Sequence, residues 1–262
     1  MTVKEIFVKS NEKKETRKAA KIINISILLI ILIGVFLFAF KQLSYSFRWH
    51  TLYEYRYKFW IGFKMTVFIS MVSLLISLLL GIFFAYARHS KIILLNYLSY
   101  FYVEIIRGTP FLVQIFIFFY VIGTAFNITN RYVNGIVILA LFSGAYVTEI
   151  IRAGVESIES SQKETAKSIG FTKFQMYRYI IIPQVIKRIM PPLAGQFVSL
   201  VKDSSLLSVI AVNEFTKNYQ EVDSITFATI ENLVLLAIGY LVLTVPISYF
   251  SKRLERKFAY ET

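Results

Sequence analysis

The sequence predicts an all-α polytopic membrane protein with about six transmembrane helices. Of its 262 residues, 56% are hydrophobic and 16% aromatic, and the mean hydropathy is +0.59, which does not suit a soluble core inside a polar surface. Five runs contain no Asp, Glu, Lys or Arg and approach the roughly 20 residues that cross a hydrocarbon core about 30 Å thick. No repeat or low-complexity linker divides the chain, so we expect one membrane domain.

Each expected span derives from these runs. The charge-free runs cover residues 22–40, 65–87, 108–130, 132–148 and 232–251. A sixth apolar region, 189–212, is interrupted only by Lys202 and Asp203. Residues 92–103 are too few to cross a bilayer alone. The expected spans are 22–40, 60–87, 96–126, 132–151, 190–212 and 228–250.

The third of these spans needs a special shape. We join residues 92–103 to the next apolar run as one long, tilted helical element over 92–126. Gly108 and Thr109 are expected to break it, and Pro110 to restart it at the first helical position, where a missing N–H does no harm.

Basic residues are spread unevenly over the predicted loops. Lys+Arg total 29 and Asp+Glu 16, a formal net charge of +13. Twenty of the basic residues fall on the side of the termini and six on the other side. The positive-inside rule therefore predicts that both termini and the loop 152–189 are cytoplasmic. This distribution accounts for the charge without nucleic acid, which is not an expected partner.

The expected organisation is set by the spans. The run 22–40 is longer than a signal-peptide core and precedes no small-residue cleavage site, so we expect an uncleaved helix. The chain has no cysteine, which excludes disulfides, Cys-ligated zinc and iron–sulfur clusters. The parts are a basic cytoplasmic segment (1–21), an N-terminal transmembrane helix with an external loop (22–58), the transmembrane domain (59–251) with a cytoplasmic loop (155–187), and a basic cytoplasmic tail (252–262).

The loop 155–187 begins with a helix signal. Ser161 to Glu164 has the S-x-x-E pattern of a capping box, in which the Ser161 hydroxyl accepts from the Glu164 backbone N–H. Gly170 then stands where a helix ends in a left-handed residue, with Phe171 covering Ala166 as in a Schellman motif.

A second helix signal comes directly after the first. Thr172 to Gln175 is another capping box, and its helix is expected to run until Pro183 stops it. A rigid excursion is unnecessary for connection alone, because a flexible loop of this length costs little extra entropy. It suits an amphipathic hairpin on the lipid headgroups or a docking surface for a cytoplasmic partner.

This loop resembles the coupling loop of bacterial ABC importer permeases. Residues 164–170 (ETAKSIG), followed after nine residues by 180–183 (IIIP), are similar to the family pattern E-A-A-x3-G-x9-I-x-L-P, with departures at Thr165 and Ile182. Further segments resemble the polar amino-acid branch of that family, of histidine, glutamine, arginine or cystine type, and together cover about residues 60–255. They are 62–66 (GFKMT), 104–110 (EIIRGTP), 144–152 (GAYVTEIIR) and 202–206 (KDSSL).

The resemblance implies a fold and a task. The fold would be a type I ABC importer-like bundle, a five-helix core preceded by one extra helix, in the bacterial cytoplasmic (inner) membrane. The task would be to import a polar amino acid by alternating access. In the family the loop helix contacts an ATP-hydrolysing subunit, and the residues expected to make that contact are Glu164, Thr165, Ala166 and Gly170.

The resemblance also implies partners. They are two copies of an ATP-binding subunit, a second permease chain, identical or related, and an extracytoplasmic amino-acid-binding protein, beside the lipid bilayer. The chain contains no Gly-Lys dipeptide and therefore no phosphate loop. ATP and Mg are thus expected on the partner, with no cofactor in this chain and no enzymatic activity of its own.

Two charges interrupt the fifth span. A charge near mid-bilayer costs at least about 2.5–3.5 kcal/mol. Lys202 and Asp203 therefore either pair with neighbouring helices or snorkel, or they line a water-filled cavity with Glu149, Ser204 and Ala145. Lys202 would then take the carboxylate of a free amino acid, and Asp203 or Glu149 its ammonium. This substrate site is a hypothesis from charge type, supported by the resemblance.

Other polar residues are expected to be structural. Glu104 and Arg107 stand at i,i+3 and would pair on the helix surface, although the broken helix beside them offers unpaired N–H groups to a gate. His50 and His89 have no partner at metal-ligand spacing, so no metal site is expected.

Alternative functions stay open at this point. One is an ABC permease for another small polar solute. A membrane enzyme would need a nucleophile–base pair, a metal cluster or paired carboxylates, for which two scattered histidines without cysteine are poor material. An ATP-independent channel or a membrane scaffold would not need a hairpin capped twice.

Overall fold

The computed structural model describes residues 18–42 and 45–259, in which helices form all the regular structure. The chain divides into two compact units, residues 1–47 and 48–262. The first unit contains α2 (Lys18–Gln42), whose side chains are almost all exposed. An apolar helix of this length that lacks a core of its own suits a lipid environment. The predicted basic segment 1–21 and tail 252–262 lie partly outside the described residues.

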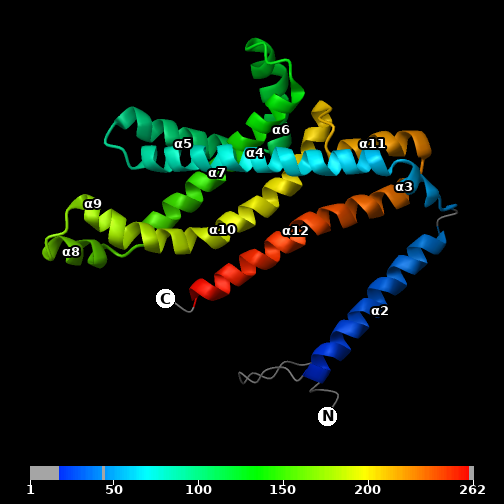
Figure 1. The fold of residues 1–262 in the computed structure, drawn as a ribbon, viewed down its shortest axis with the longest axis horizontal. Coiled ribbons are helices and arrows are strands. Elements are labelled where there is room, and N and C mark those ends of the chain that lie inside the picture. Colours follow the sequence, from blue (N-terminus) through cyan, green and yellow to red (C-terminus); the bar gives the residue numbers. More distant parts are fainter. Residues whose placement is uncertain (1–17, 43–44, 260–262) are drawn as a thin grey trace. The chain divides into compact units, whose positions relative to one another are not determined.

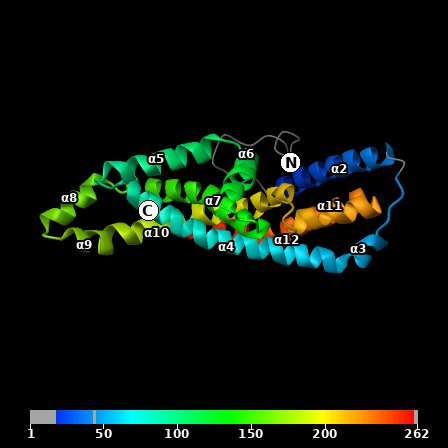
Figure 2. The same cartoon turned by 90° about the horizontal axis from the view of Figure 1, so that it is seen from above.

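The second unit carries the remaining helices. Figures 1 and 2 show α8 and α9 at one end of this unit and α3 and α11 at the opposite end, with α4 running between the ends. Its α-helices are α3 (His50–Glu54), α4 (Arg56–Arg88), α5 (Ile93–Gly108), α6 (Phe111–Phe116), α7 (Arg131–Glu156), α8 (Ser160–Ser168), α9 (Lys173–Met176), α10 (Ile182–Asp203), α11 (Phe215–Thr226) and α12 (Thr229–Ala259). The π-helical segments are η1 (Ile117–Gly123) and η2 (Tyr177–Ile181), and η3 (Ser204–Ile210) is a 3₁₀ helix.

The helices account for the predicted spans. In the described residues, five helices are long and apolar enough to cross a membrane, and the bent pair Ile93–Gly108 and Phe111–Gly123 makes a sixth if it is one span. The all-α polytopic prediction with about six spans is therefore confirmed. The five are Ala19–Gln42, Arg56–Arg88, Arg131–Glu156, Lys173–Ile210 and Thr229–Arg256.

The bent pair confirms the predicted break at Gly108 and Thr109 but corrects the expectation that residues 92–126 form one tilted element. The two halves meet at 113°, because Thr109, which precedes a proline, is extended (φ −123°, ψ 149°). Pro110 is the N-cap of α6 and not its first helical residue. Gln114, which is buried, fixes the corner by donating to the carbonyl oxygens of Ile106 (2.6 Å) and Thr109 (3.1 Å).

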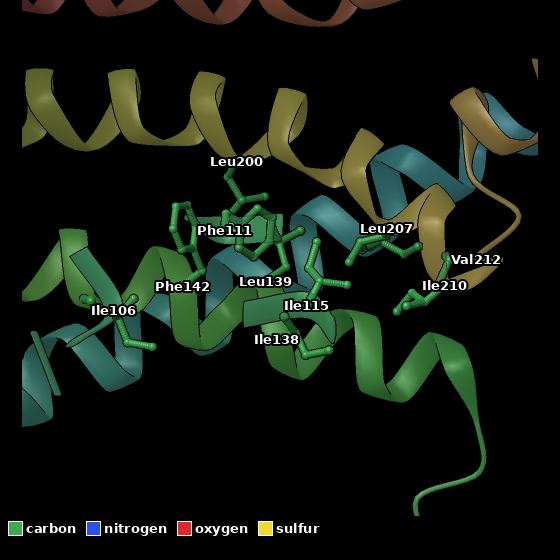
Figure 3. Packing of buried hydrophobic residues seen from close by; sticks show 12 residues of the cluster. Ile106, Phe111, Ile115, Ile138, Leu139, Phe142, Leu200, Leu207, Ile210 and Val212 are labelled. Carbon is green, nitrogen blue, oxygen red and sulfur yellow. The ribbon is translucent and has the colours of Figure 1, made fainter. Parts of the chain in front are cut away.

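The main core lies where α4, α5, α6, α7, α10 and η3 meet (Figure 3). The rings of Phe111 and Phe142 stack with centroids 4.1 Å apart. Small residues bring the backbones close: Gly81 of α4 lies against Val147, and Gly144 of α7 lies against Tyr102, whose hydroxyl donates to the Leu141 carbonyl at 2.6 Å. The buried cluster is Ile69, Ile106, Phe111, Ile115, Ile138, Leu139, Phe142, Ala145, Leu200, Leu207, Ile210 and Val212.

The helix after the loop corrects a second expectation. It does not stop at Pro183 but continues without a break over Lys173–Ile210. Pro183 lies in the first turn of α10, directly after the wider π-helical turn η2, where a proline is tolerated because the local ladder is already irregular. After η3 the chain turns at Ala211, which has a left-handed backbone (φ 57°).

Candidate functional site

The hairpin of α8 and α9 is built as a rigid turn. Gly170 has φ +87°, its N–H donates to the Lys167 carbonyl (3.0 Å), and the Phe171 N–H donates to the Ala166 carbonyl (3.0 Å), which is the complete Schellman pattern. Thr172 then forms the predicted capping box with Gln175. Both of these predictions are confirmed.

The first capping box is wrong. α8 begins at Ser160 with Glu159 as N-cap, and no side chain caps it. The Ser161 hydroxyl, already inside the first turn, donates to the Glu159 carboxylate at 3.1 Å. The helix therefore starts one residue before the S-x-x-E pattern, a difference of the size that helix ends commonly show.

The four predicted contact residues of the hairpin do not share a face. Ala166 is buried and packs with Ile158 and Met176. Glu164, Thr165 and Gly170 are exposed, so a docking partner would meet these three, while Ala166 supports the hairpin from within. Exposed apolar side chains at Ile169 and Phe174 extend this surface.

The hairpin is tied to the transmembrane helices. Arg188 of α10 donates to the Ser157 carbonyl (2.5 Å) and hydroxyl (2.8 Å). Gln184 donates to Gln162 at 2.8 Å. Gln184 thus links α10 to α8, and Arg188 links α10 to the end of α7. A displacement of α8 is therefore transmitted directly to α7 and α10.

Lys202 and Asp203 end α10 just before the helix tightens into η3. Lys202 is exposed and Asp203 half-buried, and within the described ranges neither forms an ion pair. A lysine that is exposed inside an apolar span must meet water or a partner. Their geometry is therefore compatible with the predicted binding of a charged solute.

Glu149 does not share a depth with Lys202, which corrects the proposed constellation. Gln196 of α10 donates to Ser143 of α7 at 3.3 Å, which fixes the register of these antiparallel helices. At a rise of 1.5 Å per residue, Glu149 then lies roughly 15–18 Å along the bundle from Lys202. One amino acid cannot bridge that separation with its adjacent ammonium and carboxylate groups.

Glu149 instead holds two arginines. Arg152 grips its carboxylate with two nitrogens, Nε at 3.0 Å and Nη2 closer, and Arg107 Nη1 lies 3.8 Å away. The expected pairing of Arg107 with Glu104 is therefore replaced by a pair between helices α5 and α7. Glu104 itself is exposed.

Ser204 and Ala145 do not line a cavity in this chain. Both are fully buried, and the Ser204 hydroxyl donates to the Val201 carbonyl at 2.8 Å. Ala145 belongs to the main core. The expectation that both are exposed to a water-filled pathway is wrong for this arrangement, because α7 packs tightly against its neighbours at this level.

Sequence reasoning missed Glu214, the N-cap of α11. This fully buried carboxylate accepts from the backbone N–H groups of Lys217 (2.7 Å) and Thr216 (2.8 Å), and from the hydroxyls of Tyr240 (3.1 Å) and Thr66 (3.4 Å). It thereby joins α11 to α4 and α12. Burial raises the pKa of Glu214 to about 7, although the four hydrogen bonds oppose that rise.

A signal for this site existed in the sequence. Gly62 and Thr66 stand at i,i+4 on one face of α4. A side chain at Gly62 would meet Asn218 Nδ2 at 2.7 Å and the Glu214 carbonyl at 3.0 Å. The segment 62–66 (GFKMT) is therefore the part of α4 against which α11 packs.

No metal site is found in the described part of the chain, where no three His, Asp or Glu side chains gather. His89 lies 3.8 Å from Glu156 and makes a hydrogen bond with the Ala85 carbonyl.

Comparison with known proteins adds to this geometry. The family described as "binding-protein-dependent transport system inner membrane component" matches residues 77–260. The chain belongs to this family. The predicted family, a multi-pass permease of an inner membrane, is therefore confirmed.

Relatives in the family are similar over most of their length. The chain is 34% identical over 198 residues to the glutamine transport system permease protein GlnP of Escherichia coli (strain K12), covering 75% of this chain and 90% of that protein. It is 37% identical over 201 residues to the probable glutamine ABC transporter permease protein GlnM of Bacillus subtilis (strain 168), covering 75% and 93%.

Solved structures share the fold. An amino acid ABC transporter, solved with histidines, matches with a TM-score of 0.76 and 33% identity, over 81% of this chain and 100% of that chain. The MetNI methionine ABC transporter in an inward-facing conformation matches with a TM-score of 0.57 and 18% identity, over 76% of this chain and 94% of that chain. The predicted type I importer fold is confirmed.

Proposed function

We propose that the chain is the permease subunit of an ABC importer that brings a polar amino acid into the cytoplasm by alternating access. The observation that carries the proposal is the hairpin α8–α9. It is rigid, exposed at Glu164, Thr165 and Gly170, and bonded to two spans. The amino-acid class is supported by the glutamine permeases and the amino acid transporter that the chain is similar to.

ATP hydrolysis in this proposal takes place on another polypeptide. The chain has no phosphate loop, so two ATP-binding subunits, with ATP and Mg, would dock on the hairpins of this chain and of a second permease, identical or related. An extracytoplasmic binding protein would deliver the amino acid to the outer side.

The proposed orientation places the hairpin and both termini in the cytoplasm. The charge bias supports it, since 20 basic residues lie on that side of the predicted topology and six on the other. The hairpin and α11 lie at opposite ends of the second unit (Figure 1), so α11 would face the outside.

Lys202 is the proposed ligand of the substrate carboxylate, with Asp203 as the ligand of the ammonium. The Lys202 ammonium, exposed within an apolar helix and without an ion pair among the described residues, supports this assignment. Glu149 is not retained, because two arginines neutralise it.

Uptake of radiolabelled amino acids tests the proposal. The chain would be reconstituted in vesicles with a candidate ATP-binding subunit, and unlabelled amino acids would compete. Lys202→Met should lower uptake at least about tenfold, the equivalent of about 1.4 kcal/mol of lost binding. Lys64→Met, a matched change at another exposed lysine within a span, should not. Equal uptake by both variants would contradict the site, and competition only by other solutes would change the substrate class.

A further inference from the structure

A ladder of alternating charges runs down the inner half of α7. Glu149, Arg152 and Glu156 follow one another at i, i+3 and i+7, so they lie along one stripe of the helix. Arg152 donates to both carboxylates. Arg107 of α5 extends the ladder at one end, 3.8 Å from Glu149. The ladder is defined as Arg107, Glu149, Arg152 and Glu156.

The Arg107 end of the ladder lies next to the break between α5 and α6. Arg107 is followed by Gly108, the last residue of α5, and by the extended Thr109. The corner beyond it is held by Gln114 through bonds to Ile106 and Thr109. A shift of Arg107 therefore bears directly on the direction in which α6 leaves α5.

The Glu156 end of the ladder lies where the chain leaves α7 and enters the hairpin. Glu156 is the last residue of α7, and Ser157 is its C-cap. Arg188 of α10 binds Ser157 from the other side of the hairpin. Gly154 packs against Ile189 in the same place. Displacement of α8 therefore moves Glu156 together with the start of α10.

The centre of the ladder is stiff because its charges are matched and partly shielded from water, whereas Arg107 and Glu156 at its ends are 41% and 51% exposed. Two arginines face two carboxylates, and the Arg152 and Glu149 side chains are only 26% and 28% exposed. Arginine grips a carboxylate with two parallel bonds, which fixes orientation as well as distance. Removal of Glu149 leaves Arg107 and Arg152 without their shared carboxylate at a half-buried position, so the ladder is interrupted at its centre.

We propose that these four residues are positioning residues that carry displacement of the hairpin to the break between α5 and α6, and thereby set how much transport each ATP hydrolysed produces. The inference rests on the proposed function. It requires no contact between the ladder and the substrate, because the charged groups of the ladder are paired with one another.

Two measurements on the full chain test the ladder. The chain has no cysteine, so single labels can be placed at Leu112, beyond the break, and at Glu164, on the hairpin, both exposed. In lipid nanodiscs without any partner, the distance distribution between the labels should broaden in Arg107→Gln and Glu149→Gln. In vesicles with the ATP-binding subunit, the ratio of amino acid transported to ATP hydrolysed should fall roughly fivefold or more. The double variant should be no worse than the more severe single variant.

The matched control is Lys58→Gln. It removes a pair with Glu221 (2.7 Å) that also joins two helices, α4 and α11, at the other end of the unit. Both readouts should stay at the parental value. An unchanged label distance in the ladder variants would overturn the inference, as would a parallel fall of transport and ATPase activity or additive effects in the double variant. If the label distance broadens but the parental complex imports no amino acid, the proposed function is wrong and the mechanical link stands.

Discussion

At the scale of single residues, glycines decide how closely the spans approach. A Cβ at Gly81 would lie 2.7 Å from Val147 Cβ and 3.2 Å from the Thr148 nitrogen. Neither atom belongs to the end of a flexible side chain, so the helices themselves would have to separate. Gly195 in α10 has nothing within 4 Å of its Cβ position, and its substitution is free of this conflict.

Gly81→Val should therefore destabilise the chain by about 1–3 kcal/mol through overpacking. Gly195→Ala should be neutral or stabilising by up to about 1 kcal/mol, because alanine favours a helix interior. Thermal unfolding in detergent, followed by circular dichroism, measures both. A Gly81→Val chain as stable as its parent would contradict the α4–α7 packing described.

Glu214 gives the fold a dependence on pH. Its ordinary pKa is 4.5, and burial raises it to about 7 in the folded chain. Between these two values the folded state holds a proton that the unfolded state has released. Stability is therefore greatest at low pH within this window, falls as pH rises from about 4.5 to about 7, and levels off above.

Glu214→Gln should flatten this decline, since glutamine does not titrate. The lost dependence is on the order of 3 kcal/mol. Melting temperatures of the parent and the variant from pH 5 to pH 8 measure it. Glu221→Gln, a change on the same helix away from the buried carboxylate, is the control and should keep the decline. A parental chain whose melting temperature does not change over this pH range would contradict the raised pKa of the buried Glu214 carboxylate.

At the scale of elements, periodicity and charge predicted the helices, and residues 108–110 predicted the break after α5. The angles of the bends depend on contacts that a sequence does not display. Gly170 and Thr172 were predictable because turn chemistry is local. The 113° corner at Thr109 depends on Gln114 folding back. Continuation through Pro183 depends on a π-helical turn before it, which no periodicity signals.

The candidate site divides in the same way. Charges inside spans could be located from the sequence, and Arg152 stands at i,i+3 from Glu149 on the same helix. The second partner of Glu149, Arg107, could not be predicted because it comes from another helix. Ser204 follows Asp203, and Ala145 lies one helical turn before Glu149, yet both Ser204 and Ala145 are buried. Their burial results from packing of the whole bundle, which the sequence does not display. Glu214 was missed because one acidic residue in a loop resembles any other.

Gly170→Ala tests the hairpin as a mechanical element. An alanine at φ +87° costs about 1–2 kcal/mol, although it has open space around it. The end of α8 should fray and ATP-driven uptake should fall several-fold, while the amount of protein in the membrane is unchanged. Gly195→Ala is again the control. Uptake equal to that of the parent would show that a rigid turn is not required.

At the scale of the whole molecule, we predict opposite sides of the membrane for the two ends of the second unit. Because the chain lacks cysteine, single cysteines at Ser168 and Ser224, both exposed, report on sidedness. In intact cells a membrane-impermeant thiol reagent should label Ser224→Cys and spare Ser168→Cys. The reverse pattern would invert the topology derived from the basic loops.

The central claim is that the hairpin transmits the work of a separate ATPase to a bundle that binds the solute. Its most direct measurement is ATP-driven amino-acid uptake, with co-purification of the ATP-binding subunit, for the parent, a chain lacking residues 161–170, and the milder Glu164→Arg. We predict that the deleted chain loses both ATP-driven uptake and co-purification of the ATP-binding subunit. Glu164→Arg should weaken uptake and co-purification while the spans remain inserted. Retention of ATP-driven uptake by the deleted chain would contradict the account.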